Sequence, residues 1–375
     1  MRLQKLLFQT TFIIVFPGLI GQNTKAIQNS AVTDKTVKIG LLIRDKNSLS
    51  AMQGAEMAIK RANKKGGYNG KPFQLEVRSM EGPWGAGAKE AVDLIFKENV
   101  CALIGACDGR NSHLVEQVTT KARIVFLSVW ASDPTLSQAF VPWYFTCVPT
   151  DLQQADVLID EIYNNRKIVR IATVADSDYD SKMALESFVK RAASAGKNDS
   201  LQVYYDNKSQ DFNNLIDKIV NANVGGIILF GKPHASMKLI DQMKQSKINQ
   251  PLFATLSLMD EDEFSDQGMK NYENIVAVSS GNTSKSKCSA FLSEYQKTYG
   301  SLPGAVASYS FDGMSLLIEA IRMAGTDREN IRKYMAGMHF EGVTGPIQFD
   351  EKGKRIGKVN LMEIKNGLLV DIEIK

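Results

Sequence analysis

Two consecutive series of short apolar segments, separated by amphipathic helical segments, constrain the fold more than any other feature of this sequence. The apolar segments of the two series cover residues 37–43, 73–77, 100–104 and 124–127, and then 168–174, 201–205, 226–230 and 251–254. The segments between them carry apolar residues at helical spacing. Strands that alternate with amphipathic helices form parallel sheets covered on both faces. The sequence therefore predicts an α/β protein with two units of similar size.

The length of 375 residues exceeds one ordinary domain, which agrees with two lobes. Apolar residues make up 44% of the chain and charged residues 23%, as in globular proteins with a substantial core. The net charge of +4 is modest and the basic residues are spread out, so no nucleic-acid partner is predicted. The P-loop, the G-x-S-x-G elbow and H-E-x-x-H are absent, and neither a cofactor nor a metal is expected.

The N-terminus has the pattern of a secretory signal. Arg2 and Lys5 precede an apolar run over 6–20, and the small residue Gly21 follows it. The run is shorter than the roughly 20 apolar residues that a spanning helix needs. Residues 1–21 are therefore predicted to be a signal peptide and the mature protein to be periplasmic, with an uncleaved anchor as the alternative.

The chain has four cysteines, Cys101, Cys107, Cys147 and Cys288, at spacings that suit neither a zinc site nor a redox motif. Free thiols that pack as small hydrophobic groups are the favoured interpretation. A Cys107–Cys147 disulfide is the alternative, because export would permit it.

Polar loops follow two of the predicted strands. Residues 108–112 come after the strand at 100–104, and residues 130–133 come after the strand at 124–127. Ligands of open α/β sheets sit at the carboxyl ends of the strands, so these loops are predicted to form one wall of a small-molecule cleft. No nucleophile, base and metal set accompanies them, which favours a binding protein over an enzyme.

Two acidic segments are further candidate sites. Residues 176–180 begin like a calcium loop, but Ser181 and Ser187 stand where that loop needs glycine and glutamate. Residues 260–263, all acidic, are interpreted as a solvated helix start, where the helix dipole favours acids. A role facing a ligand is the alternative for residues 260–263.

Several segments together resemble one family, the periplasmic type I solute-binding proteins of the branched-chain amino acid and amide group. The similar segments include 37–40, 53–58, 66–72, 102–105, 145–154, 309–313 and 340–350. The resemblance covers nearly the whole mature chain, from Val37 to about Ile374.

The resemblance implies two Rossmann-like lobes with parallel sheets, joined by three crossovers near 148–149, 278–279 and 340–341. Lobe one would combine residues 37–148 with 280–340, and lobe two residues 149–279 with 341–375. A small ligand would be held between the lobes of a monomer. Hinge closure would then present the protein to the permease of an ABC transporter.

The resemblance also implies site residues. In amino-acid-binding members, two helix starts hold the ligand carboxylate, and a helix N-terminus suits an anion because its free N–H groups point outward. The predicted ligand-binding residues at the matching positions are Arg44, Gly109, Arg110, Asn111, Trp130, Ala131, Ser132, Tyr179, Lys232 and Ser257. The position that receives a ligand ammonium in the family falls near Leu256 and Ser257, neither of which is acidic.

These departures disfavour an ordinary amino acid as ligand and leave a small polar organic molecule, with anions among the candidates. Trp130 would narrow the pocket or stack on a flat ligand, unless it and Trp84 are core aromatics. Arg44 and Arg110 are suited to pair with a carboxylate, and a surface role for Arg110 stays open. Uptake transport is the favoured function. A ligand-sensing regulatory protein of the same fold is the alternative, and an exported hydrolase using Asp108 or Asp133 with His113 comes last.

Overall fold

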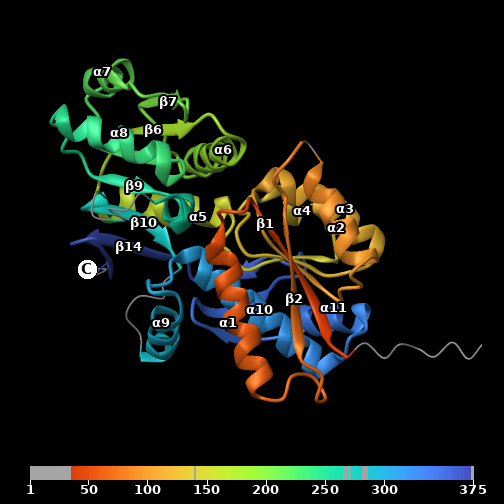
Figure 1. Cartoon of the computed structure of the whole chain (residues 1–375). Coiled ribbons are helices and arrows are strands. Elements are labelled where there is room, and N and C mark those ends of the chain that lie inside the picture. The colour runs from red at the N-terminus through yellow and green to blue at the C-terminus, as the bar shows by residue number, and fades with distance from the viewer. Residues whose placement is uncertain are drawn as a thin grey trace, which may run out of the picture. The chain divides into compact units, whose positions relative to one another are not determined.

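The structure, a computed structural model, describes most of the chain from Lys35 onward (Figure 1). The described residues are 35–83, 85–138, 141–264, 269, 272–280 and 286–372. The predicted signal peptide 1–21 and Trp84 lie outside them.

The first sheet contains five of the described strands, all parallel, in the order β2-β1-β3-β4-β5. The strands are β1 (Val37–Ile43), β2 (Phe73–Ser79), β3 (Leu103–Ala106), β4 (Phe126–Ser128) and β5 (Tyr144–Thr146). Every residue of β1 except Lys38 is buried, as expected for a strand covered on both faces.

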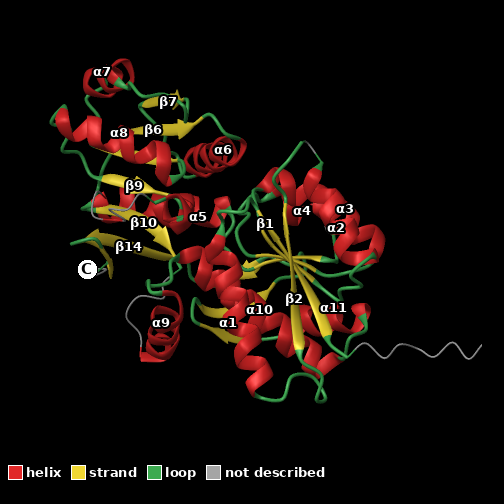
Figure 2. Cartoon of the chain, in the orientation of Figure 1, coloured by secondary structure: helices red, strands yellow, loops and turns green. Residues whose placement is uncertain are grey.

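Helices α1 (Leu49–Lys64), α2 (Ala86–Phe96), α3 (Gly109–Ala122) and α10 (Ala305–Ala324) belong to the same part of the fold (Figure 2). Helix α10 is buried along most of its length, as its apolar sequence predicted. At its closest approach to α1 a side chain would not fit, because a Cβ on Gly54 would stand 2.2 Å from Ala307 O. Glycine therefore lets the backbones of the two helices touch.

The second sheet contains seven described strands in the order β15-β14-β10-β9-β8-β6-β7. They are β6 (Ile171–Asp176), β7 (Leu201–Tyr205), β8 (Gly226–Phe230), β9 (Leu252–Ala254), β10 (Ile275–Ser279), β14 (Asn360–Lys365) and β15 (Leu368–Asp371). Strands β6 to β10 are parallel, and β14 and β15 add an antiparallel edge. A turn at Asn366-Gly367 joins β14 to β15, and both of its residues have positive φ, which suits a tight hairpin turn.

The helices of this second unit are α5 (Asp151–Ile159), which continues as a π-helix over Asp160–Asn165, α6 (Tyr179–Ser194), α7 (Asn213–Asn221) and α8 (Pro233–Gln245). Helices α9 (Ser286–Tyr299) and α11 (Arg328–Gly337) complete the described set of long helices (Figure 1). The predicted alternation of strands and helices in two units is confirmed.

Three short described strands, β11 (Phe340–Gly342), β12 (Gly345–Phe349) and β13 (Arg355–Ile356), form a separate antiparallel sheet. Their contacts run to β5: Thr146 N donates to Gly353 O at 2.9 Å, and the rings of Phe145 and Phe349 lie 5.1 Å apart. Strands β14 and β15 join the second sheet instead. The lobe limits expected from the family resemblance stay a prediction.

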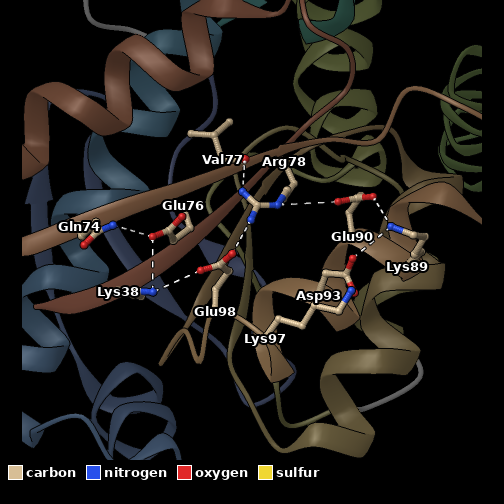
Figure 3. A network of polar contacts seen from close by, with 10 residues as sticks. All are labelled: Lys38, Gln74, Glu76, Val77, Arg78, Lys89, Glu90, Asp93, Lys97 and Glu98. Carbon is tan, nitrogen blue, oxygen red and sulfur yellow. Dashed lines mark hydrogen bonds and ion pairs between the residues drawn. The ribbon is translucent and has the colours of Figure 1, made fainter. Parts of the chain in front are cut away.

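A charged network covers one part of the first sheet, where β2 is the edge strand (Figure 3). Glu98 accepts hydrogen bonds from Lys38 at 3.2 Å and from Arg78 at 2.7 Å. Charged side chains on an edge strand disfavour pairing with strands of other molecules.

All four cysteines lie in the described part of the chain and are free, so the alternative Cys107–Cys147 disulfide is wrong. The Cys107 sulfur lies 3.2 Å from the Ser112 hydroxyl. Burial raises the pKa of the Cys101 thiol to about 12, which keeps it protonated.

The buried Asp312 of α10 fastens the turn between β11 and β12. Its carboxylate accepts Val343 N–H and Thr344 N–H, both at 2.8 Å, and the Thr344 hydroxyl at 2.6 Å. The hydroxyl and the carbonyl of Thr344 in turn accept hydrogen bonds from the Arg355 guanidinium. The same guanidinium donates to Cys147 O at 2.8 Å and to Pro346 O at 3.0 Å. Asp312 and Arg355 therefore join segments far apart in the sequence through one residue, Thr344.

Replacing Asp312 by alanine is expected to lower the free energy of unfolding by about 3–5 kcal/mol, because it leaves buried donors without an acceptor. Urea unfolding followed by circular dichroism measures the change. The matched control is Asp327→Ala, which removes the cap of α11 (a 2.9 Å bond from Asn330 N) and should cost about 1 kcal/mol. Equal losses in the two variants would contradict the role assigned to Asp312.

Candidate functional site

Two helices begin at the carboxyl ends of strands, one from each sheet, and their first turns meet. Asp108 caps α3 by accepting Asn111 N–H at 2.8 Å, and Asp178 caps α6 by accepting Ser181 N–H at 2.7 Å. Because Asp108 supplies a cap, α3 begins at Gly109, inside the segment 108–112 that the sequence predicts to be a polar loop.

The contact between the two helix starts is a hydrogen bond from Gly109 N–H to Asp180 Oδ1 at 2.9 Å. The chain's own carboxylate thus occupies the N-terminus of α3, where free N–H groups and the helix dipole favour an anion. Burial, followed by the charge of Asp108, raises the pKa of Asp180 to about 7. A Cβ on residue 109 would lie 2.9 Å from Asp133 Cβ, so glycine permits this approach.

A second contact between the two units joins Tyr179 to Asp133. The Tyr179 hydroxyl donates to Asp133 Oδ2 at 2.9 Å, and His113 Nε2 lies 3.2 Å from the same oxygen. The hydrogen bond with Asp133, helped by Glu116, raises the pKa of His113 to about 9. Burial alone would raise the pKa of Asp133, but its bonds with His113, Thr135 and Tyr179 outweigh burial and lower it to about 2.

A third contact starts at Arg44, directly after β1. Arg44 Nη1 lies 2.8 Å from Asp260 Oδ2 and 2.9 Å from Glu263 Oε1. Burial acts to lower the pKa of Arg44, but Asp260 and Glu263 outweigh burial and raise it. Arg44 therefore stays a cation among carboxylates.

The interpretation of residues 260–263 as a solvated helix start is wrong. Glu261–Glu263 form one short 3-10 turn, and the carboxylates bind other parts of the chain. Asp262 accepts Ser50 N–H at 3.0 Å, and Glu261 accepts the N–H groups of Val306 and Ala307 at the start of α10. Burial raises the pKa of Glu261 to about 8. These acids cap helices that are distant in sequence, which a local pattern cannot reveal.

Two hollows lie beside these contacts. The inner cavity, of about 20 Å³, is lined by Arg44, Ser48, Ala51, Ala106, Cys107, Asp108, Trp130, Asp180, Lys232, Asp260, Asp262 and Val306. The outer groove, of about 510 Å³, is lined by Met80, Gly82, Pro83, Asp108, Arg110, Asn111, Ser177, Asp178, Tyr179, Asp180 and Lys232. Asp108, Asp180 and Lys232 line both, so the two hollows are neighbours.

The structure brings most of the predicted site residues to these hollows. Arg44 and Trp130 line the inner cavity, Arg110, Asn111 and Tyr179 line the outer groove, and Lys232 lines both. Trp130 also packs against the core, as its alternative interpretation expects. The Arg110 guanidinium lies over the Tyr179 ring, 5.1 Å from its centroid.

Four predicted residues line neither hollow. Gly109 donates its N–H to Asp180, and Ala131 donates its N–H to the Ser128 hydroxyl. Ser132 O accepts Asp151 N–H, and the Ser257 hydroxyl lies 2.8 Å from that of Thr255. That any of the ten residues touches a ligand stays a prediction.

The acids and serines of the lining that the sequence did not single out as ligand-binding are Ser48, Ser177, Asp178, Asp180, Asp260 and Asp262. A signal was present for Asp178 and Asp180, because they directly follow a predicted strand. In the part of the chain that the structure describes, no group of three or more His, Cys, Asp or Glu side chains is arranged to hold a metal ion. Among the described helices none is both long and apolar enough to cross a membrane.

A sequence profile described as periplasmic binding protein matches residues 36–368. The chain belongs to this family, whose members are substrate-binding proteins of ABC transporters that take amino acids or other small organic ligands. The family resemblance and the fold class predicted from the sequence are thereby confirmed.

Individual relatives are distant. The Leu/Ile/Val-binding protein homolog 1 of Brucella abortus is 24% identical over 347 residues, which is 90% of this chain and 92% of the relative. The isoleucine complex of LivJ from Streptococcus pneumoniae superposes with a TM-score of 0.79 at 21% identity, covering 89% of this chain and 97% of LivJ. A solute-binding protein of R. palustris in complex with benzoate has the same TM-score at 16% identity, covering 90% and 95%. Likeness at this level establishes the fold and leaves the ligand open.

His113 is expected to give the stability a pH dependence. Its pKa in the folded protein, about 9, exceeds the unfolded value of about 6.5, so its stabilising effect is complete below pH 6.5 and disappears as the pH rises through 9. The difference in unfolding free energy between the wild type and His113→Gln should therefore be larger at pH 6 than at pH 9.5. Urea unfolding at both values measures it, with the exposed His339→Gln as control. A difference independent of pH would contradict the pairing with Asp133.

Proposed function

We propose that this chain captures a small organic solute between its two α/β units and delivers it to the permease of an ABC uptake transporter. The observation that carries the proposal is the set of three polar contacts, Gly109 to Asp180, Tyr179 to Asp133 and Arg44 to Asp260, beside the inner cavity and the outer groove. Each joins an element of the first unit to a segment next to a strand of the second. Contacts of this kind are what a hinge-closing protein makes and breaks.

The hinges would lie in the crossovers between the sheets. We place the lobes as the family resemblance implies, with residues 37–148 and 280–340 in one and residues 149–279 and 341–375 in the other. The antiparallel strands β11 to β13, which follow the third crossover, pack beside β5 of the first sheet before the chain enters β14. Arg355 binds the carbonyl of Cys147, before the first crossover, and that of Thr344, after the third. These two bonds would hold the two crossovers together during closure.

A binding role without catalysis is supported by the surroundings of His113. His113 and Asp133 do come together, as a hydrolase would require, but their other partners are Glu116, Thr135 and Tyr179. Neither His113 nor Asp133 lines the inner cavity or the outer groove.

Members of the family act outside the cytoplasm, and residues 1–21 are the proposed signal for export. The mature protein is proposed to be a monomer.

Mass spectrometry of the purified, denatured protein is the first test, since a solute carried through purification identifies the ligand. Uptake of that solute by vesicles holding the cognate permease and ATPase should depend on added binding protein. Binding without any effect on uptake, together with a response of a membrane receptor, would favour the sensing alternative. Turnover of the solute by the purified protein would overturn both.

Tyr179→Phe should weaken solute binding without unfolding the protein, because the closed form loses one bond to Asp133. Losing a hydrogen bond to a charged group, about 1.5–3 kcal/mol, corresponds to a rise in Kd of roughly 10- to 150-fold. Calorimetric titration with the co-purified solute measures the change. Tyr204→Phe, at an exposed position of β7, is the control and should leave Kd unchanged. An unchanged Kd in Tyr179→Phe would contradict the closing role of this contact.

A further inference from the structure

The charges around the inner cavity and the outer groove narrow the class of solute, on the premise that the proposed function holds. We infer that the solute is a small organic cation, such as a protonated amine or a guanidinium. The two hollows together are lined by five carboxylates, Asp108, Asp178, Asp180, Asp260 and Asp262, against three cations, Arg44, Arg110 and Lys232. An additional positive group brings the balance close to neutral.

The chain's own cations are already engaged with groups of the protein. Arg44 is shared by Asp260 and Glu263, and Lys232 lies 4.0 Å from Glu263 Oε1. Burial acts to lower the pKa of Lys232, but Glu263, Asp178 and Asp180 outweigh burial and raise it. An anionic solute would have to compete with these carboxylates for the cations.

The N-terminus of α3, which faces the site, also has its anion. Gly109 N–H at the start of α3 binds Asp180 Oδ1, and Asp108 lies beside it as the helix cap. A carboxylate from a solute would have to expel Asp180 and would still meet the charge of Asp108. A cationic solute leaves this arrangement in place and gains from both carboxylates.

Two further groups of the inner cavity point to a ligand independently of the acids. The Ser48 hydroxyl is buried, with the residue 4% exposed, and its oxygen accepts no hydrogen bond. Burial acts to raise the pKa of the nearby Asp45, but groups that include Arg44 and the Ser48 O–H outweigh burial and lower it. A buried oxygen without a donor suits the N–H of an ammonium or guanidinium group. Trp130 lines the same cavity, and an indole ring beside carboxylates is a favourable surface for a cation.

The volumes indicate how the solute enters. The inner cavity, of about 20 Å³, has room for about one water molecule. The neighbouring groove of about 510 Å³ shares Asp108, Asp180 and Lys232 with it. The charged end of the solute would enter the inner cavity while the Gly109–Asp180 and Arg44–Asp260 contacts are open. Both contacts would form again behind it, with the remainder of the solute in the groove.

The affinity should then depend on pH. Asp180 has a pKa of about 7 because of burial and Asp108, and it faces Cys107 and Asp108 beside α3, Asp178, Asp151 of α5 and Lys232 of α8. Without solute, Asp180 is partly protonated near neutral pH. A bound cation favours the ionised form, so binding releases protons and becomes tighter from pH 6 to pH 8.

Calorimetric titration of the full mature protein tests the inference with three sets of probes: the cations agmatine, putrescine and choline, the anions benzoate and 3,4-dihydroxybenzoate, and leucine with isoleucine. We expect at least one cation to bind, more tightly at pH 8 than at pH 6, and the other sets to fail. Binding of an anion or of leucine with no cation bound would overturn the inference while sparing the proposed function. No binding in any set would count against both.

Variants then locate the cation that binds. Asp180→Asn should raise its Kd at least 10-fold and remove the pH dependence, whereas the exposed Asp217→Asn should do neither. Trp130→Ala should weaken binding, and Trp130→Phe should restore part of it, because an aromatic ring remains. Thermal unfolding of each variant establishes that it is folded. An unchanged Kd in folded Asp180→Asn and Trp130→Ala would place the cation elsewhere and overturn the inference.

Discussion

The arrangement of the site depends on one hydrogen bond, from Gly109 N–H to the Asp180 carboxylate. It joins the first turn of α3 to the first turn of α6, so that the carboxyl ends of β3 and β6 come to the same place. A side chain at residue 109 would collide with Asp133, and a neutral residue at 180 would leave the start of α3 without an anion. Glycine and an acid are therefore both needed for the two units to meet in this way.

The architecture could be predicted from the sequence because it is encoded locally. In a near-continuous apolar strand such as Val37–Ile43, and in the helical spacing of α1, the pattern of a few neighbouring residues predicts which side chains are buried. The Asn366-Gly367 turn is encoded locally as well. The start of α3 at Gly109 is set by a single capping bond from Asp108, which apolar periodicity does not report.

The site could be predicted only in part, and the reason is again physical. Loops after strands located Arg110 and Trp130 at the two hollows, and the family resemblance located Arg44, Tyr179 and Lys232 there. The acids were harder because their partners are distant in sequence: Gly109 and Asp180 are separated by 71 positions, and Val306 and Glu261 by 45. A run of acidic residues has the same sequence whether its side chains face solvent, a helix N-terminus or a ligand. Only the fold distinguishes these environments.

Arg355 has a consequence for the way the proposed closure would proceed. Its guanidinium donates to the carbonyl of Cys147, just before the proposed first crossover. It also donates to the carbonyls of Thr344 and Pro346, in the segment that follows β11. Two connecting strands bound to one rigid planar group cannot twist independently. Under the proposed hinge closure they would rotate about a common point, which confines the opening to a single direction and returns the acids of one unit to the same helix start of the other in every cycle.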